Sequence, residues 1–283
     1  MEIEVSELQR LLEQTQRMAL INNKMQPQVL GCVIDVKGTY ATTTNIVRDG
    51  VTSISRFIAN LAPPEHGPEQ VLIANISKVL GLLKKHSGVV EIYNTDNKLR
   101  IRNKTGVKRQ STVISDSRAK AFPHINKSIA QWDKESNERF ESALSDISKG
   151  KYNCSGGDGT VQAFFTLKIK AGLLLDALEC GNVNGQKITE YLFCAHTGVI
   201  WVEVGDYMNG FVSTHIGPSH NMDFVTSVAG GLDNVLRKCD KNEEVKLLFF
   251  DFKDQGAGIS VALLSSSLCV FQREVPDNGS NPK

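Results

Sequence analysis

The spacing of apolar residues at the start of the chain is helical. Apolar side chains recur every three or four positions from Val5 to about Leu20, which predicts an amphipathic helix over this segment. The opposite stripe carries Arg10, Gln14 and Arg17, so we expect these three side chains to face solvent.

Strand patterns and one further helix follow in the first half. Asn75 is a suitable N-cap for a helix that runs to about His86 and carries Lys84 and Lys85 in its last turn. Gly38 marks the turn of a hairpin. Runs of β-branched and other apolar residues predict strands at 29–37, 39–47, 51–59, 70–74, 89–93, 98–102 and 111–115.

The second half repeats this order of elements. Helical patterns lie at about 171–181 and 230–241, and strand patterns lie at 161–169, 191–206, 222–228, 245–252, 258–264 and 268–274. Units rich in strands with one short helix each predict α+β domains. We therefore expect two copies of one domain, each with two short amphipathic helices on one face of its sheets.

The 283 residues suggest about two domains. We place an N-terminal domain at 1–122 and a C-terminal domain at 161–283. Residues 123–160 form a long connector between them, because the stretch begins with Pro123 and continues in a polar, helical-looking segment from about Trp132 to Ile147.

Composition excludes several classes of protein. Charged residues make up 22% of the chain and the net charge is +1, which disfavours a disordered or histone-like protein. We find no apolar run long enough for a membrane span and no secretory signal, and the six scattered cysteines favour a reduced, cytoplasmic protein. The six histidines show no metal-ligand spacing, and no nucleophile or phosphate-loop motif is present. We therefore expect neither an enzyme nor a metal or cofactor site.

Two stretches carry a family resemblance. Residues 224–274 (FVTSVAGGLDNVLRKCDKNEEVKLLFFDFKDQGAGISVALLSSSLCVFQRE) and the opening SELQRLLEQTQRM resemble the DNA sliding clamp family. The order of elements is similar to the two-domain type of T-even-type phage clamps and proliferating cell nuclear antigen. The resemblance implies a polymerase processivity factor, built as a homotrimeric ring of six domains with helices lining the hole. Its implied partners are double-stranded DNA, bound without sequence preference, a DNA polymerase and a clamp-loader ATPase, in the host bacterial cytoplasm if the chain is phage-encoded.

The resemblance also implies which residues contact DNA. Phosphate attraction needs basic side chains on the helices that line the hole, and each of these is alternatively an ordinary solvated residue. The basic candidates on the predicted helices are Arg10, Arg17, Lys78, Lys84, Lys85, Lys170, Arg237, Lys238 and Lys241.

The family further implies an apolar pocket for partner peptides on the outer face of the C-terminal domain. The matching positions are in the last strands, at Val261, Leu263, Val270 and Phe271. Plain sheet core is the alternative, because alternation does not identify the outward face. The connector is longer than the usual family linker. Its segment from Trp132 to Ile147 could have either of two roles: it covers this pocket, or it docks on a partner.

The overall charge hides an asymmetry between the halves. Residues 1–122 carry +6, the connector carries −1 and residues 161–283 carry −4. A basic strand run at Lys98, Arg100 and Arg102 is either a solvated surface or a contact with the acidic domain of the next chain. Two other functions also remain open: a viral structural or assembly ring that binds no DNA, and a monomeric clamp-like polymerase accessory subunit.

Overall fold

The chain folds into two compact units. The computed structural model describes residues 1–21, 24–48, 52–62, 70–95, 98–104, 111–115, 142–153, 159–180, 190–206 and 210–275. The first unit comprises Met1–Arg17, Pro27–Asn45 and Ser55–Glu141, and the second comprises Met18–Gln26, Ile46–Ile54 and Ser142–Lys283. Two short N-terminal segments and the end of the predicted connector therefore group with the second unit. Residues 123–141, with Trp132, lie outside the described residues.

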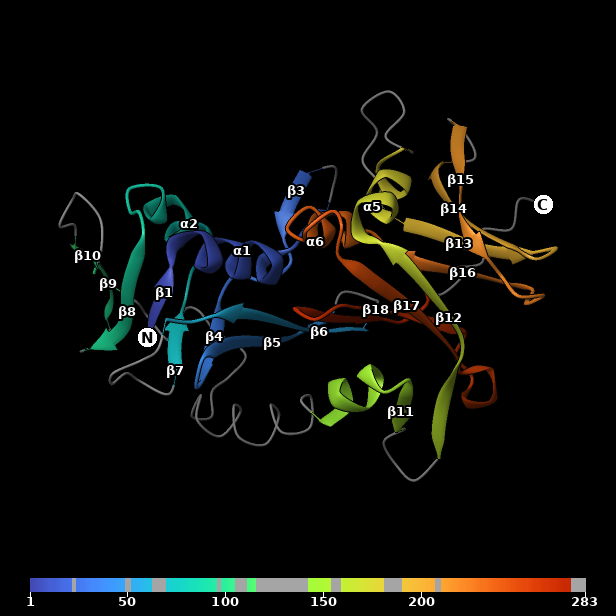
Figure 1. Ribbon diagram of the computed structural model, residues 1–283, viewed down its shortest axis with the longest axis horizontal. Helices are drawn as coiled ribbons and strands as arrows, with labels where there is room; N and C mark the ends of the chain where they lie inside the picture. The colour runs from blue at the N-terminus through green and yellow to red at the C-terminus, as the bar shows by residue number, and fades with distance from the viewer. Residues whose placement is uncertain are drawn as a thin grey trace. The chain divides into compact units, whose positions relative to one another are not determined.

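Two antiparallel rows of strands build the first unit (Figure 1). One row has the order β1-β8-β9-β10, with β1 at Glu2–Glu4, β8 at Val89–Thr95, β9 at Lys98–Asn103 and β10 at Ser111–Ser115. The other has the order β7-β4-β5-β6, with β7 at Gln70–Ile73, β4 at Cys32–Lys37, β5 at Tyr40–Arg48 and β6 at Thr52–Asn60. The hairpin turn at Gly38 is confirmed, and this glycine has a φ of 63°.

Two helices of the first unit lie side by side against these sheets (Figure 1). Helix α1, Val5–Gln16, buries its apolar stripe through Val5, Leu8, Leu11 and Leu12. It ends earlier than predicted, because Arg17 adopts a φ of 37° and the chain continues into strand β2, Met18–Ile21. Helix α2, Ile76–Leu83, begins as predicted: the side-chain oxygen of Asn75 accepts a hydrogen bond from the Lys78 amide at 2.8 Å.

The second unit repeats the design with two sheets and two helices. The first sheet has the order β15-β14-β13-β16, with β13 at Glu190–His196, β14 at Val199–Asp206, β15 at Gly210–Pro218 and β16 at Phe224–Ala229. The other row is β11-β12-β17-β18-β19, with β11 at Lys151–Asn153, β12 at Thr160–Lys170, β17 at Glu244–Asp251, β18 at Ile259–Leu264 and β19 at Leu268–Gln272. Helices α5, Ala171–Glu179, and α6, Leu232–Leu236, contact each other. The unit also includes β2, most of β3 (Lys24–Pro27), a helix at 142–148 and the 3₁₀ turn η2, Lys253–Gln255.

An aromatic core joins the two sheets of the second unit. The Phe249 ring of β17 lies 5.8 Å from that of Phe193, 4.8 Å from that of Phe224 and 5.6 Å from that of Phe165. The opposite face of the same strands is covered too, because Leu144 and Ile147 of the helix at 142–148 are fully buried. Strands β18 and β19 are therefore buried on both faces.

The α+β class is as predicted, and each strand-rich unit has one pair of adjacent short helices; the helix at 142–148 of the second unit is additional. Helix α6 is shorter than the predicted 230–241, since it begins after Gly231, whose φ is 106°, and ends at Leu236. Strands β1, β2, β3, β11 and β15 were not predicted. No helix in the described part of the chain is long and apolar enough to cross a membrane.

Candidate nucleic-acid interface

Helix α2 and the turn that ends it carry three exposed basic side chains. Lys78 is exposed on the helix, and Lys84 and Lys85 are exposed in the turn that ends it. In the described part of the chain none of these three ammonium groups has an ion-pair partner. The next residue, His86, is buried instead and contacts Asn103 and Thr112. The helix end thus turns its lysines outward while its histidine ties it to the sheet.

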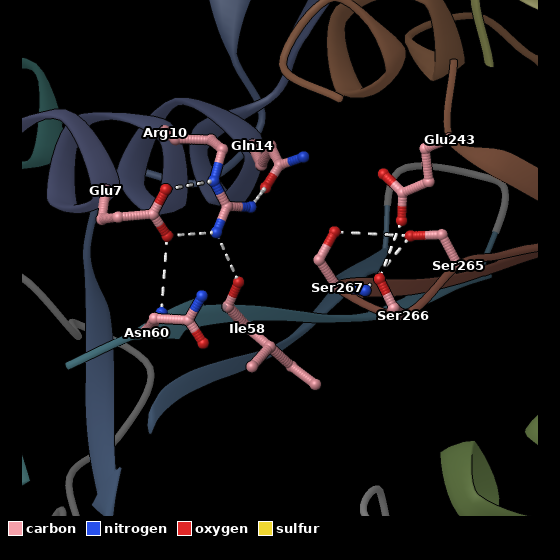
Figure 2. Close-up of polar contacts among 9 residues, drawn as sticks. All are labelled: Glu7, Arg10, Gln14, Ile58, Asn60, Glu243, Ser265, Ser266 and Ser267. Atoms are coloured by element: carbon pink, nitrogen blue, oxygen red, sulfur yellow. Dashed lines mark hydrogen bonds and ion pairs between the residues drawn. The ribbon is translucent and has the colours of Figure 1, made fainter. Parts of the chain in front are cut away.

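Helix α1 does not offer its arginines to solvent as the sequence predicted. The Arg10 guanidinium donates hydrogen bonds to Glu7 at 2.7 Å, to Gln14 at 3.0 Å and to the Ile58 carbonyl oxygen of β6 at 2.8 Å (Figure 2). The bond from Arg10 holds the pKa of the Glu7 carboxyl below its usual range, against the opposing effect of burial. Arg10 therefore fastens α1 to the strand beneath it.

Arg17 also departs from its predicted place. The residue is only 2% exposed, and the chain leaves the helix here, at a φ of 37°. The stripe of α1 through Gln14 and Arg17 faces the interior, and the exposed side is that of Ser6. Helix α1 therefore adds no basic residue to a phosphate-binding surface.

In the second unit, two predicted lysines are brought together at the start of α5. Lys170 is exposed at the N-cap, and the Gly172 amide donates to the Lys241 carbonyl oxygen at 2.9 Å. Two residues on, the Glu243 carbonyl oxygen accepts from the Ala171 amide at 2.9 Å. The Glu243 carboxylate also accepts from the Ser266 hydroxyl at 2.9 Å, beside the contact of Ser265 with Ser267 (Figure 2). The loop that carries Lys241 is thus fixed on two sides.

The last predicted arginine is neutralised by carboxylates. Arg237 donates to Glu179 of α5 at 2.5 Å and lies 3.2 Å from Asp233, one turn earlier on α6. It therefore joins α5 to α6, while Lys238 stays exposed beside it. Carboxylates at Asp176 and Asp240 are exposed on the same two helices and their loop, so this surface has mixed charge where α2 is purely basic.

Asp233 is held from below by a buried tyrosine. The Tyr191 hydroxyl donates to Asp233 at 2.7 Å, and both groups are buried. Burial, together with the Asp233 charge, raises the pKa of Tyr191 well above its usual value. The phenol remains a protonated donor at neutral pH, which fixes the carboxylate that in turn positions Arg237.

The residues predicted to form a partner pocket do not line an open surface. Val261, Leu263, Val270 and Phe271 are each at most 2% exposed. Pairing of β17, β18 and β19 puts the first three on the face of Phe249, in the core. Phe271 is on the other face, where its ring stacks on that of Tyr152 at 5.1 Å. The end of the predicted connector covers the face of Phe271, and the core between the two sheets buries the other three.

Exposed lysines of this kind can attract phosphates without regard to sequence. Among the described residues, no group of three histidine, cysteine or acidic side chains could hold a metal ion. The carboxylates of Glu7, Glu179 and Asp233, which neutralise two predicted arginines, were missed from sequence. Their spacing gave a usable signal: Glu7 and Arg10 are three residues apart and Asp233 and Arg237 four, the separations at which helical side chains meet.

Comparison with known proteins gives a similarity of fold. No protein-family model and no curated protein sequence matches the chain. Among solved structures, DNA polymerase III subunit beta from Pseudomonas aeruginosa matches with a TM-score of 0.58 at 12% identity, over 100% of this chain and 66% of that one. A putative DNA polymerase III beta subunit from Eubacterium rectale gives 0.59 at 13%, over 98% and 65%. The beta subunit from Thermotoga maritima gives 0.58 at 13%, over 97% and 64%.

The chain therefore has the fold of the DNA polymerase sliding clamps. It spans about two thirds of the length of the solved structures it matches, between 64% and 66% in these three. The matched structures are bacterial beta subunits rather than the two-domain type expected from sequence. The likeness extends over both units of this chain.

Proposed function

We propose that this protein is the subunit of a ring-shaped DNA sliding clamp that encircles duplex DNA and tethers a replicative polymerase. The observation that supports this best is the duplicated unit in the fold of polymerase sliding clamps, each copy presenting two adjacent helices. The exposed lysines of α2 and of the α5 N-terminus supply attraction to phosphates without base recognition. Such contacts allow a ring to slide, because no base sequence holds it in place.

The proposed ring contains three copies of the chain. Two units in each chain give six units in a trimer. The chain spans about two thirds of the length of the matched structures, so a matched structure has room for three such units where this chain has two. Strands β10 and β15 end their sheets in the described part of the chain and are suited to head-to-tail contact. In this arrangement Lys98 and Arg100, on the strand next to β10, attract the acidic second unit of the next copy.

The partners of the proposed ring follow from its task. Double-stranded DNA passes through it, a DNA polymerase is tethered to it, and a clamp-loader ATPase opens and closes it around DNA. The ring acts by binding and not by catalysis, in the cytoplasm where the DNA is copied.

Mass in solution separates this proposal from its rivals. We expect multi-angle light scattering at micromolar concentration to give about three times the chain mass of 31.1 kDa. A monomer that binds DNA through one basic face would instead be an accessory subunit. A ring that binds neither DNA nor polymerase would be an assembly protein.

A further inference from the structure

The sheet β15-β14-β13-β16 has a row of three apolar side chains and one histidine on its outer face that the proposed function does not use. Strand pairing places Cys194 opposite both Trp201 and Val225, and places Trp201 opposite His215. Directly paired residues of an antiparallel sheet point to the same face, so these four side chains form one row across all four strands. We call them the Trp201 row. The other face, with Tyr191, Phe193 and Val202, is buried in the core.

The row has apolar neighbours and is partly open to solvent, because Cys194 is buried while Trp201, Val225 and His215 are partly or fully exposed. Val225 is 59% exposed and lies on β16, the strand that ends this sheet in the described part of the chain. Trp201 is partly exposed, as are Leu192 and Val199 on the adjoining rows of the same face. Single exposed apolar residues need no explanation, but a contiguous set of this kind marks an interaction surface.

The surroundings of the row are acidic. Glu203 lies opposite Leu192 and accepts a hydrogen bond from the Trp201 indole at 3.1 Å, and Glu190 accepts from Ser227 at 2.9 Å. None of the four strands contains a lysine or an arginine. Burial, and to a lesser extent the Glu203 charge, raises the pKa of Cys194 to about 11. The thiol is therefore neutral at physiological pH and, being buried, adds no charge beneath the row.

We propose that the Trp201 row is the docking site for an amphipathic helix of a partner protein, whose apolar stripe is flanked by lysines or arginines. The row crosses three strand spacings, or about 14 Å, which matches about ten residues of helix at 1.5 Å each. Apolar side chains of the helix would pack on Trp201 and Val225. Its basic flank would meet Glu190 and Glu203, so charge complementarity selects a cationic partner. This proposal does not depend on DNA binding.

Tryptophan fluorescence can test the docking directly. The chain has two tryptophans, so the W132F background leaves Trp201 as the only reporter. The probe is a 14-residue peptide with the sequence Leu-Lys-Lys-Leu-Leu-Lys-Leu repeated twice, and its control has glutamate in place of every lysine. We expect the lysine peptide to shift Trp201 emission to shorter wavelength and to bind at least tenfold more tightly than the glutamate peptide. Equal binding of the two peptides, or no change in Trp201 emission, would overturn the proposal.

Two matched variants locate the site. Val225→Lys places a charge in the row, and Leu173→Lys makes the same change at a 60% exposed position on helix α5. We expect V225K to weaken binding of the lysine peptide at least fivefold and L173K to change this affinity less than twofold. Thermal melting shows that both proteins are folded. An equal loss in both variants would contradict the assignment. So would a change in the solution mass of V225K alone, because the row would then be a contact between copies of the chain.

Discussion

The basic side chains near the helices fall into two groups according to what they bond. Arg10 and Arg237 are held by carboxylates and link a helix to its neighbours. Lys84 and Lys85 extend into solvent at the end of α2. An ion-paired guanidinium contributes little net field at a distance, whereas an unpaired ammonium releases counterions from DNA when it approaches a phosphate. In the proposed clamp the lysines would therefore attract DNA, and the two arginines stabilise the fold.

Removing the α2 lysines should weaken DNA binding in a salt-dependent way. For K84A/K85A we expect the slope of log K against log salt to fall by about 1.8, since each phosphate contact contributes about 0.9. The measurement is fluorescence anisotropy of a labelled 30-base-pair duplex between 50 and 200 mM NaCl. K149A/K151A removes two other exposed lysines from the second unit and should leave the slope unchanged. An equal fall in this control would show that net charge alone sets the affinity.

Removing Arg10 should affect folding instead. For Arg10→Ala we expect the free energy of unfolding to drop by about 1–2 kcal/mol, because a part-buried hydrogen-bonded fork is lost. Arg102→Ala, which breaks an exposed ion pair with Glu91, should cost less than about 1 kcal/mol. Urea denaturation measures both.

The Arg10 effect should also depend on pH in a defined direction. The folded-state pKa of Glu7 is depressed by Arg10, so the pair stabilises the fold above the unfolded-state pKa of Glu7. This contribution is lost as pH falls through the folded-state pKa. The difference between wild type and R10A should therefore shrink in acid, and a difference that grew would refute this account of the fork.

Elements differ in how far the sequence predicts them. Helix α2 and the hairpin at Gly38 follow from local signals, since Asn75 caps one and the glycine takes a positive φ in the other. Strand β15 was missed because His215, Gly217 and Pro218 are typical of loops, and only its pairing with β14 makes it a strand. For helix α1 the sequence pattern predicted the buried stripe correctly. It did not predict the environment of Arg10, because that depends on β6, which is far away in sequence.

The same limit applies to the candidate site. The lysines of α2 were predictable because a short amphipathic helix with an apolar stripe leaves its other side in water. The burial of Phe271 was not, because it depends on the segment at 142–153 that packs over its face of the sheet. The burial of Val261 depends on the other sheet of the unit, which packs on the face of Phe249. Tertiary contacts decide these positions, and local patterns do not contain them.

Two helix glycines should respond oppositely to alanine. A methyl group at Gly81 of α2 meets nothing within 4 Å, whereas one at Gly172 of α5 would lie 3.0 Å from the Lys241 carbonyl oxygen. We expect Gly81→Ala to raise the free energy of unfolding by about 0.5–1 kcal/mol through helix propensity. Gly172→Ala should give no gain or a loss. Thermal unfolding of both variants checks the sign, and equal gains would mean that the Lys241 loop is not fixed against α5.

At the scale of the whole molecule, the two units are copies of one design with different charge. The first presents lysines on α2, and the second presents mixed charge on α5 and α6 together with the acidic outer sheet face of the Trp201 row. A near-neutral total of +1 is compatible with a basic hole and an acidic outer surface. Topology, and not affinity, would then hold the proposed ring on DNA.

Topological retention on DNA tests this central proposal most directly. The protein is incubated with linear duplex DNA that carries biotin at both ends, streptavidin is added to block the ends, and the DNA is washed in 1 M NaCl to remove electrostatic binders. We predict that protein stays on the blocked DNA through the wash and is released when a restriction enzyme cuts the DNA. Complete loss of the protein in the salt wash, with or without blocked ends, would contradict the proposal that the chain encircles DNA.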